Sequence, residues 1–112
     1  MEIRKTKKGK ISFVLDYNEL EVLRNRLNDH LEKESIELRS IRLVTQDAVN
    51  RHLQMSVLFD LVKKHYAKLY SNEITQTLSL SRFEALALLT QLKDAQSFSL
   101  QQLKGGLHQL LS

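Results

Sequence analysis

The chain has 112 residues, a formal net charge of +4, a charged fraction of 27% and a hydrophobic fraction of 42%. These values are typical of a folded globular protein and exclude a disordered segment, and the length fits a single α+β domain over residues 1–112. The sequence contains no cysteine, which excludes disulfides, thiolate metal ligands and a cysteine nucleophile. No apolar run resembles a secretory signal or reaches the roughly 20 residues of a membrane helix. We therefore expect a cytoplasmic protein with no membrane contact.

Residues 2–15 have the pattern of a β-hairpin. Ile11, Phe13 and Leu15 alternate with Ser12 and Val14, as in a half-buried strand, and the preceding strand is more polar. Gly9 can supply the positive φ that a short hairpin loop needs. The alternation in "ITQTLSL", residues 74–80, predicts a third strand, and we expect one small antiparallel sheet.

The segments "LDYNELEVLRNRLND", residues 15–29, and "LSRFEALALLTQLKD", residues 80–94, resemble each other. Asp16 and Ser81 are good N-cap residues, and each is followed three residues later by the glutamate of a capping box. Leucines then recur at helical spacing in both segments. We predict the same strand-to-helix junction twice, with the first helix ending near residues 30–35.

Residues 36–71 are predicted to be the longest helical stretch, a long central helix. Its part from Met55 to Val62 is apolar nearly all round, which is typical of a buried helix or of a partner surface. A break near "LVTQD", with Thr45 as a second N-cap, stays open.

The last predicted helix begins after Ser99, with Gln102 completing a further capping box and Phe98 packing on Leu103. Gly105 and Gly106 are expected to interrupt it, because glycine costs about 1 kcal/mol relative to alanine in a helix. The glycine pair and the apolar surface at residues 55–62 favour a homodimer.

Basic residues gather at two places in the sequence. The hairpin tip and the end of the central helix contain Arg4, Lys5, Lys7, Lys8, Lys10, Lys63, Lys64 and Lys68. These cations are the candidate site of a nucleic-acid-binding accessory protein, because each could contact a phosphate. The plainer interpretation is a solvated turn on an edge strand and a helix end whose lysines favour the negative pole of the dipole, with Tyr66 and Tyr70 packed inward.

No catalytic or metal-binding motif stands out. The histidines lie at no helical metal spacing from one another: His30, His52, His65 and His108. Asp47 with Arg51, and Asp60 with Lys64, have the spacing of helix-surface ion pairs. We therefore expect neither an enzyme nor a cofactor or metal site. The preferred function is a non-enzymatic protein–protein interaction module that self-associates and has an unknown protein partner.

Overall fold

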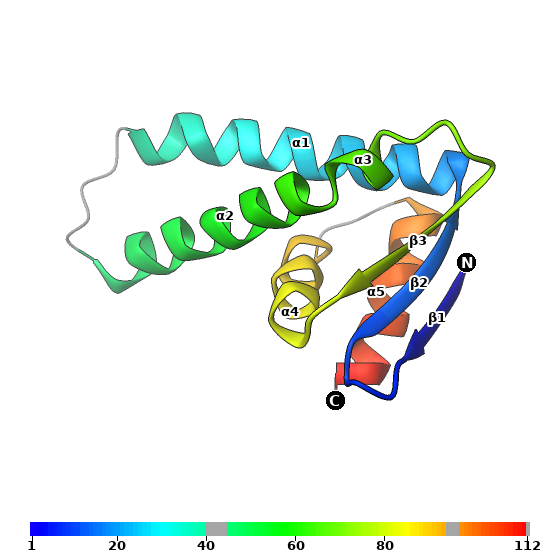
Figure 1. The fold of residues 1–112 in the computed structure, drawn as a ribbon. Helices are drawn as coiled ribbons and strands as arrows, with labels where there is room; N and C mark the ends of the chain where they lie inside the picture. Colours follow the sequence, from blue (N-terminus) through cyan, green and yellow to red (C-terminus); the bar gives the residue numbers. More distant parts are fainter. Residues whose placement is uncertain (40–44, 94–96, 112) are drawn as a thin grey trace.

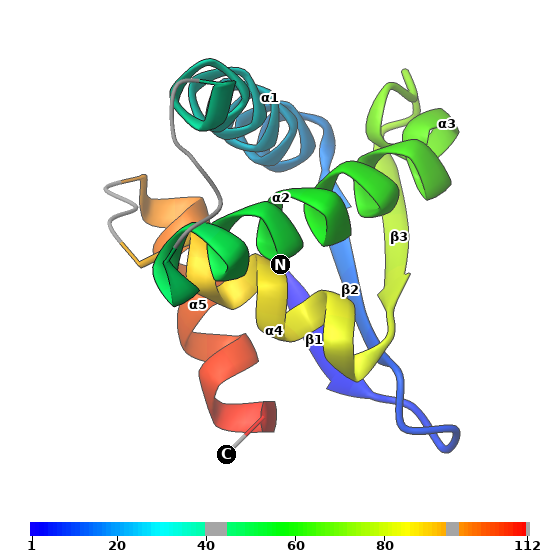
Figure 2. The ribbon, with the colours of Figure 1, turned by 90° about the vertical axis from the view of Figure 1, so that its left-hand side faces the viewer.

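The computed structural model describes residues 1–39, 45–93 and 97–111. Within these ranges the elements are β1 (Glu2–Lys5), β2 (Ile11–Asp16), α1 (Tyr17–Arg39), α2 (Gln46–Lys64), α3 (Tyr66–Leu69), β3 (Thr75–Leu80), α4 (Arg82–Gln91) and α5 (Phe98–Leu111). The strands form one antiparallel sheet, and the helices gather on one side of it (Figures 1 and 2). The expected α+β class, a hairpin and a third strand packed on helices, is confirmed.

The sheet has the strand order β1-β2-β3. Phe13 at its centre lies opposite Ile3 on β1 and opposite Leu78 on β3. Since side chains alternate between the two faces of a strand, this register places the apolar residues of the strands on the face that the helices cover. Gly9, with φ of 79°, closes the loop between β1 and β2 as expected.

The two predicted capping boxes are both present. The Asp16 N–H donates to Glu19 Oε1 at 3.0 Å, and the Glu19 N–H donates to Asp16 Oδ1 at 2.8 Å. The equivalent bonds between Ser81 and Glu84 are 2.9 and 3.2 Å long. Because β2 and β3 are antiparallel, the two junctions start α1 and α4 from opposite ends of the strand pair.

The expected end of the first helix at residues 30–35 is wrong. Helix α1 continues to Arg39 and, at 23 residues, is longer than any other described helix. Residues 30–39 contain neither glycine nor proline, so nothing in them stops a helix. Leu38, in the last turn, is buried. The long helix is therefore α1, antiparallel to α2 (Figure 1).

The helix expected over residues 36–71 is divided. Its first residues belong to α1, residues 40–44 lie outside the described residues, and Thr45 caps α2 by accepting a hydrogen bond from the Ala48 N–H at 3.1 Å. A second break follows at His65, where φ and ψ of −102° and 17° depart from helical values before the short helix α3. After this break, Leu69 of α3 is buried.

The expectations for the last helix are wrong in two respects. Helix α5 begins at Phe98, so Ser99 lies inside it and is not its cap, and Phe98 is 75% exposed and does not pack on the buried Leu103. The helix also runs without interruption through Gly105 and Gly106. Four buried leucines anchor its apolar face, which outweighs the low helix propensity of the glycines.

One hydrophobic cluster unites the elements. Its fully buried larger members are Ile11, Phe13, Leu15, Leu20, Leu23, Leu27, Leu58, Leu61, Leu69, Leu78, Leu80 and Leu88. They come from two strands and from helices α1 to α4, and leucines of α5 complete the cluster. The core therefore fixes how α2 and α4 lie side by side, which positions the candidate site.

Candidate functional site

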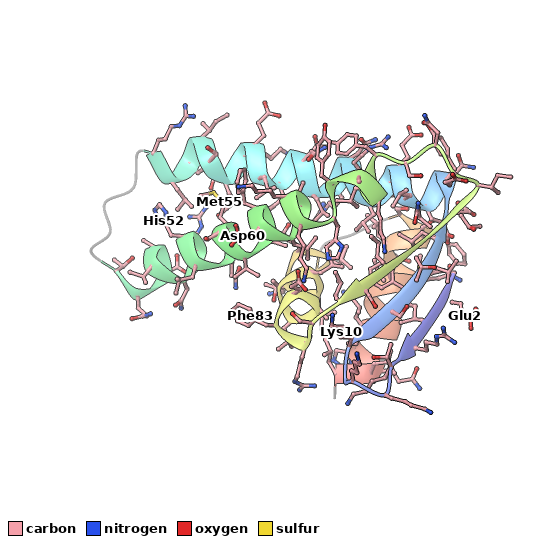
Figure 3. The ribbon with its side chains drawn as sticks, in the orientation of Figure 1. Glu2, Lys10, His52, Met55, Asp60 and Phe83 are labelled. Atoms are coloured by element: carbon pink, nitrogen blue, oxygen red, sulfur yellow. The ribbon has the colours of Figure 1, made fainter. Side chains whose placement is uncertain are left out.

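An apolar groove lies between α2 and α4. Its volume is about 320 Å³, and its lining is Asn50, Leu53, Gln54 and Val57 of α2 with Phe83, Leu86, Ala87 and Thr90 of α4. Leu53 is 60% exposed and Phe83 is 68% exposed. Phe83 points away from the sheet (Figure 3). Exposed large apolar side chains gathered in a concave surface are typical of a contact site for another molecule.

Helical periodicity explains this groove. On α4, Ala85 and Leu88 enter the core, so Phe83, Leu86 and Thr90 occupy another face of the same helix. The groove carries no charged side chain, and its polar groups are two amides and one hydroxyl. Such groups donate and accept hydrogen bonds, so the surface suits a neutral, apolar protein segment better than an anion.

A second groove, of about 600 Å³, lies between α1 and α2. Its apolar lining consists of Leu31, Met55, Phe59 and Val62, and polar residues including Glu32 form its remaining wall. Met55 faces α1 (Figure 3). The run from Met55 to Val62 is therefore not a uniformly buried helix, because it contributes to this groove and to the core.

A polar cluster joins the outer halves of α1 and α2. Arg51 donates to both carboxylate oxygens of Glu34, from Nε at 3.2 Å and from a terminal nitrogen at 2.7 Å, and also contacts Glu37. The expected helix-surface pair of Arg51 with Asp47 is therefore wrong, because Arg51 turns toward α1. The hydrogen bond from Arg51 lowers the pKa of Glu34, and both glutamates raise the pKa of Arg51.

Histidines flank this cluster. Burial lowers the pKa of His30, and the charges of Arg26 and Arg51 lower it further, although Glu34 opposes this. The His52 Nε2 atom is buried with no hydrogen-bond partner, on the α2 side of the cluster (Figure 3). Across the described ranges, no group of three or more histidine and carboxylate side chains is placed to hold a metal ion.

The positive charges of three predicted basic residues act on His65. Its Nε2 lies 3.7 Å from Glu84 Oε2, and Lys64 Nζ lies 3.5 Å from Glu84 Oε1. Lys64 therefore pairs with α4 and not with Asp60 as expected. Burial lowers the pKa of His65, Glu84 raises it, and the positive charges of Lys64, Lys68 and Lys10 lower it. The fold therefore places Lys10 beside the start of α4 (Figure 3), where its charge acts together with those of Lys64 at the end of α2 and Lys68 in α3.

The other predicted cations are not brought into this cluster. Lys7 and Lys8 lie in the hairpin loop, which projects from the end of the sheet opposite to α3 (Figures 1 and 2). Arg4 and Lys5 are exposed on the edge strand β1, and Lys63 is exposed on α2.

The tyrosines at the end of the α2–α3 segment do not pack inward. Tyr66 and Tyr70 stack on each other with ring centroids 4.5 Å apart, and both are exposed. Tyr70 accepts a hydrogen bond from Asn28 Nδ2 at 2.6 Å, and the Arg24 guanidinium lies 4.9 Å from its ring centroid. Arg24 also donates to the Leu69 carbonyl at 3.1 Å. These polar residues of α1 therefore hold α3 in place, a structural role that the sequence did not reveal.

Among the described residues, no helix combines the length and the hydropathy that a membrane span requires. Comparison with protein-family models, with curated proteins and with solved structures finds no match to this chain. Function must therefore be inferred from the surface of the molecule.

Sequence reasoning missed the α2–α4 groove. Its residues belong to two predicted helices, and no local pattern says which helices become neighbours. A signal was nevertheless present, because apolar residues continue around α4 beyond the face that Ala85 and Leu88 define, at Phe83 and Leu86. An amphipathic helix with an excess apolar face indicates a second contact surface.

Proposed function

We propose that this chain is a non-enzymatic interaction module that self-associates and binds a protein partner in the α2–α4 groove. The observation that supports it most is the groove itself, with Leu53 and Phe83 exposed beside uncharged polar groups. Apolar and aromatic side chains at the centre of an interface, with few charges, are the usual source of binding free energy between proteins. The proposed location is the cytoplasm, which agrees with the absence of cysteine.

The partner segment that fits best is an amphipathic helix. Side chains of α2 and α4 line the groove, and the apolar face of a third helix can lie against them. Its groove-facing residues should be uncharged, because a buried charge would find no opposite charge in the lining. Phe83, Leu53 and Leu86 are the expected centre of this contact.

The test begins with recovery of the full chain from its native cell together with the molecules that stay bound. Each recovered protein is then purified and its affinity for the chain is measured by calorimetry. We expect Leu53→Ser to weaken the affinity at least tenfold, which corresponds to about 1.4 kcal/mol. Ile36→Ser is the matched control, because Ile36 is also 60% exposed but lies on α1 outside the groove. Equal affinities of the two variants would contradict the groove assignment.

A nucleic-acid-binding accessory role is the second candidate. The charges of Lys10, Lys64 and Lys68 that act on His65 favour it, and Lys10 adjoins the hairpin loop that contains Lys7 and Lys8. Glu84 also neutralises part of this charge.

Heparin retention and RNA or DNA binding distinguish the two candidates. A nucleic-acid role requires affinity that falls steeply with salt and drops when Lys7, Lys8 and Lys10 become glutamine. No retention on heparin at low salt would exclude this role. The protein-interaction role predicts that these substitutions leave the affinity for the protein partner unchanged.

A further inference from the structure

Strand β3 offers a free edge. It is the last strand in the order β1-β2-β3, and in Figure 2 no described element lies beside its outer edge below α3 and the end of α2. Thr75 and Thr77 are exposed. A free strand edge presents unpaired N–H and C=O groups, which readily pair with another strand.

The hydrogen bonds of the β2–β3 ladder identify these outward groups. The Tyr17 N–H donates to the Ile74 carbonyl at 3.0 Å, one position beyond the pair of Asp16 and Thr75. In an antiparallel ladder, bonded pairs alternate with non-bonded pairs, so Ile74, Gln76, Leu78 and Leu80 direct their backbone groups toward β2. The N–H and C=O groups of Thr75, Thr77 and Ser79 consequently point away from the sheet.

The two edges of the sheet differ in how they are protected. Strand β1 is short, and its sequence "EIRK" places Arg4 and Lys5 on the edge, which discourages pairing. Strand β3, "TQTLSL", has no charge and no proline. Immediately before it, Ile74 is 85% exposed, a large apolar side chain with no cover in the monomer.

We propose that β3 pairs in antiparallel orientation with β3 of a second copy, about a two-fold axis at Thr77. In this register Thr77 pairs with the Thr77 of the other copy, Thr75 pairs with Ser79, and every outward backbone group of these residues is satisfied. Ile74 lies opposite Leu80 and becomes covered. The inference rests on the self-association proposed above and identifies the surface that produces it.

The chemistry favours a second copy over an unrelated strand. A two-fold antiparallel pair places each residue opposite a residue of the same segment. A strand with charges of one sign would therefore repel its own copy, whereas β3 has no charged side chain. Each copy also carries a net charge of +4, and the neutral β3 edge keeps the contact away from Arg4 and Lys5. The hydroxyl-bearing residues Thr75, Thr77 and Ser79 would form cross-strand pairs that stabilise a sheet.

Disulfide trapping tests the register, because the natural chain has no cysteine. In a hydrogen-bonded antiparallel pair the Cα atoms are about 5.5 Å apart, within the range of a disulfide. Thr77→Cys should therefore cross-link to its own copy on mild oxidation. Thr75→Cys is the matched control, since the two Thr75 positions would be about 13 Å apart along the strands. We expect at least fivefold more cross-linked dimer from the variant at 77, and equal yields would overturn the inference.

Sedimentation velocity on the full chain tests the edge itself. Thr77→Pro removes an outward N–H, which the monomer tolerates on an edge strand, whereas Thr77→Val keeps the backbone donor. We expect the proline variant to be a folded monomer by circular dichroism and the valine variant to remain a dimer. A wild-type dimer that persists in a folded proline variant would overturn the edge inference while leaving self-association intact. A monomeric wild type at high concentration would overturn both.

Discussion

Gly106 of α5 lies directly against the side chain of Ile3 on β1, so close that a Cβ at Gly106 would collide with Ile3 Cδ1. Gly105, one residue earlier on the same helix, has no atom within 4 Å of the equivalent position. The adjacent glycines therefore differ in role. Gly106 permits the contact of α5 with β1 inside one copy, so the homodimer expected from the glycine pair has no support from this residue.

Alanine substitution should separate the two glycines. Gly105→Ala should raise the free energy of unfolding by about 1 kcal/mol, because alanine is the better helix former and meets no neighbour. Gly106→Ala should be less stable than Gly105→Ala by about 1–2 kcal/mol, since Ile3 must move. Urea unfolding measures both values. In an Ile3→Val background, which lacks Cδ1, the difference in stability between the two alanine variants should largely disappear. If the effects of Ile3→Val and Gly106→Ala were strictly additive, the contact between these residues would be contradicted.

The contact of Arg51 with Glu34 should hold the outer halves of α1 and α2 together. Glu34→Gln should lower the melting temperature more than Glu37→Gln, because Glu34 is the less exposed carboxylate and accepts two hydrogen bonds from Arg51. Arg51→Lys should not restore the wild-type value, since an ammonium cannot make the paired contact. Thermal unfolding at low salt checks this order, and equal melting temperatures for the two glutamine variants would contradict it.

Removal of either capping side chain should destabilise the folded protein. Asp16→Ala and Ser81→Ala should each lower the free energy of unfolding by about 1 kcal/mol, because each removes a side-chain acceptor for a backbone N–H at a helix start. Ser99→Ala is the control, since Ser99 lies inside α5 and should change stability by less than about 0.5 kcal/mol. If Ser99→Ala lowered the free energy of unfolding as much as Ser81→Ala, Ser99 would act as a helix cap, as the sequence suggested.

Stability should fall in two stages as the pH is lowered. Burial lowers the pKa of His30 and His65 below the ordinary value of about 6.5, so the unfolded chain binds these protons first and stability is lost as the pH falls below about 6.5.

The hydrogen bond from Arg51 lowers the pKa of Glu34. Burial would raise the pKa of Glu84, but hydrogen bonds with Ser81 and the charges of Lys64 and His65 together lower it, so a second loss should begin below about pH 4.3. Urea unfolding across this range measures both stages, and His65→Gln should weaken the first. Constant stability between about pH 7.5 and 5 would contradict the histidine assignment.

Local signals in the sequence predicted much of the fold. The alternation of side chains marked the strands, and Asp16 and Ser81 marked the starts of two helices, because these features depend on residues only a few positions apart. Helix ends were predicted less well. Residues 30–39 contain no residue that stops a helix, so α1 continues through them, and at Gly105 and Gly106 the buried leucines of α5 favour a longer helix than propensity alone suggests.

The sequence by itself therefore determined the class of the fold, the hairpin, the repeated junction and the absence of cysteine chemistry. Only the tertiary structure decided which helices are neighbours, and so it alone revealed the groove of Leu53 and Phe83, the turn of Arg51 toward Glu34, and the free edge of β3. The physical reason is that these features join residues far apart in the chain. Their positions follow from how a whole set of leucines packs at once, which no local pattern encodes.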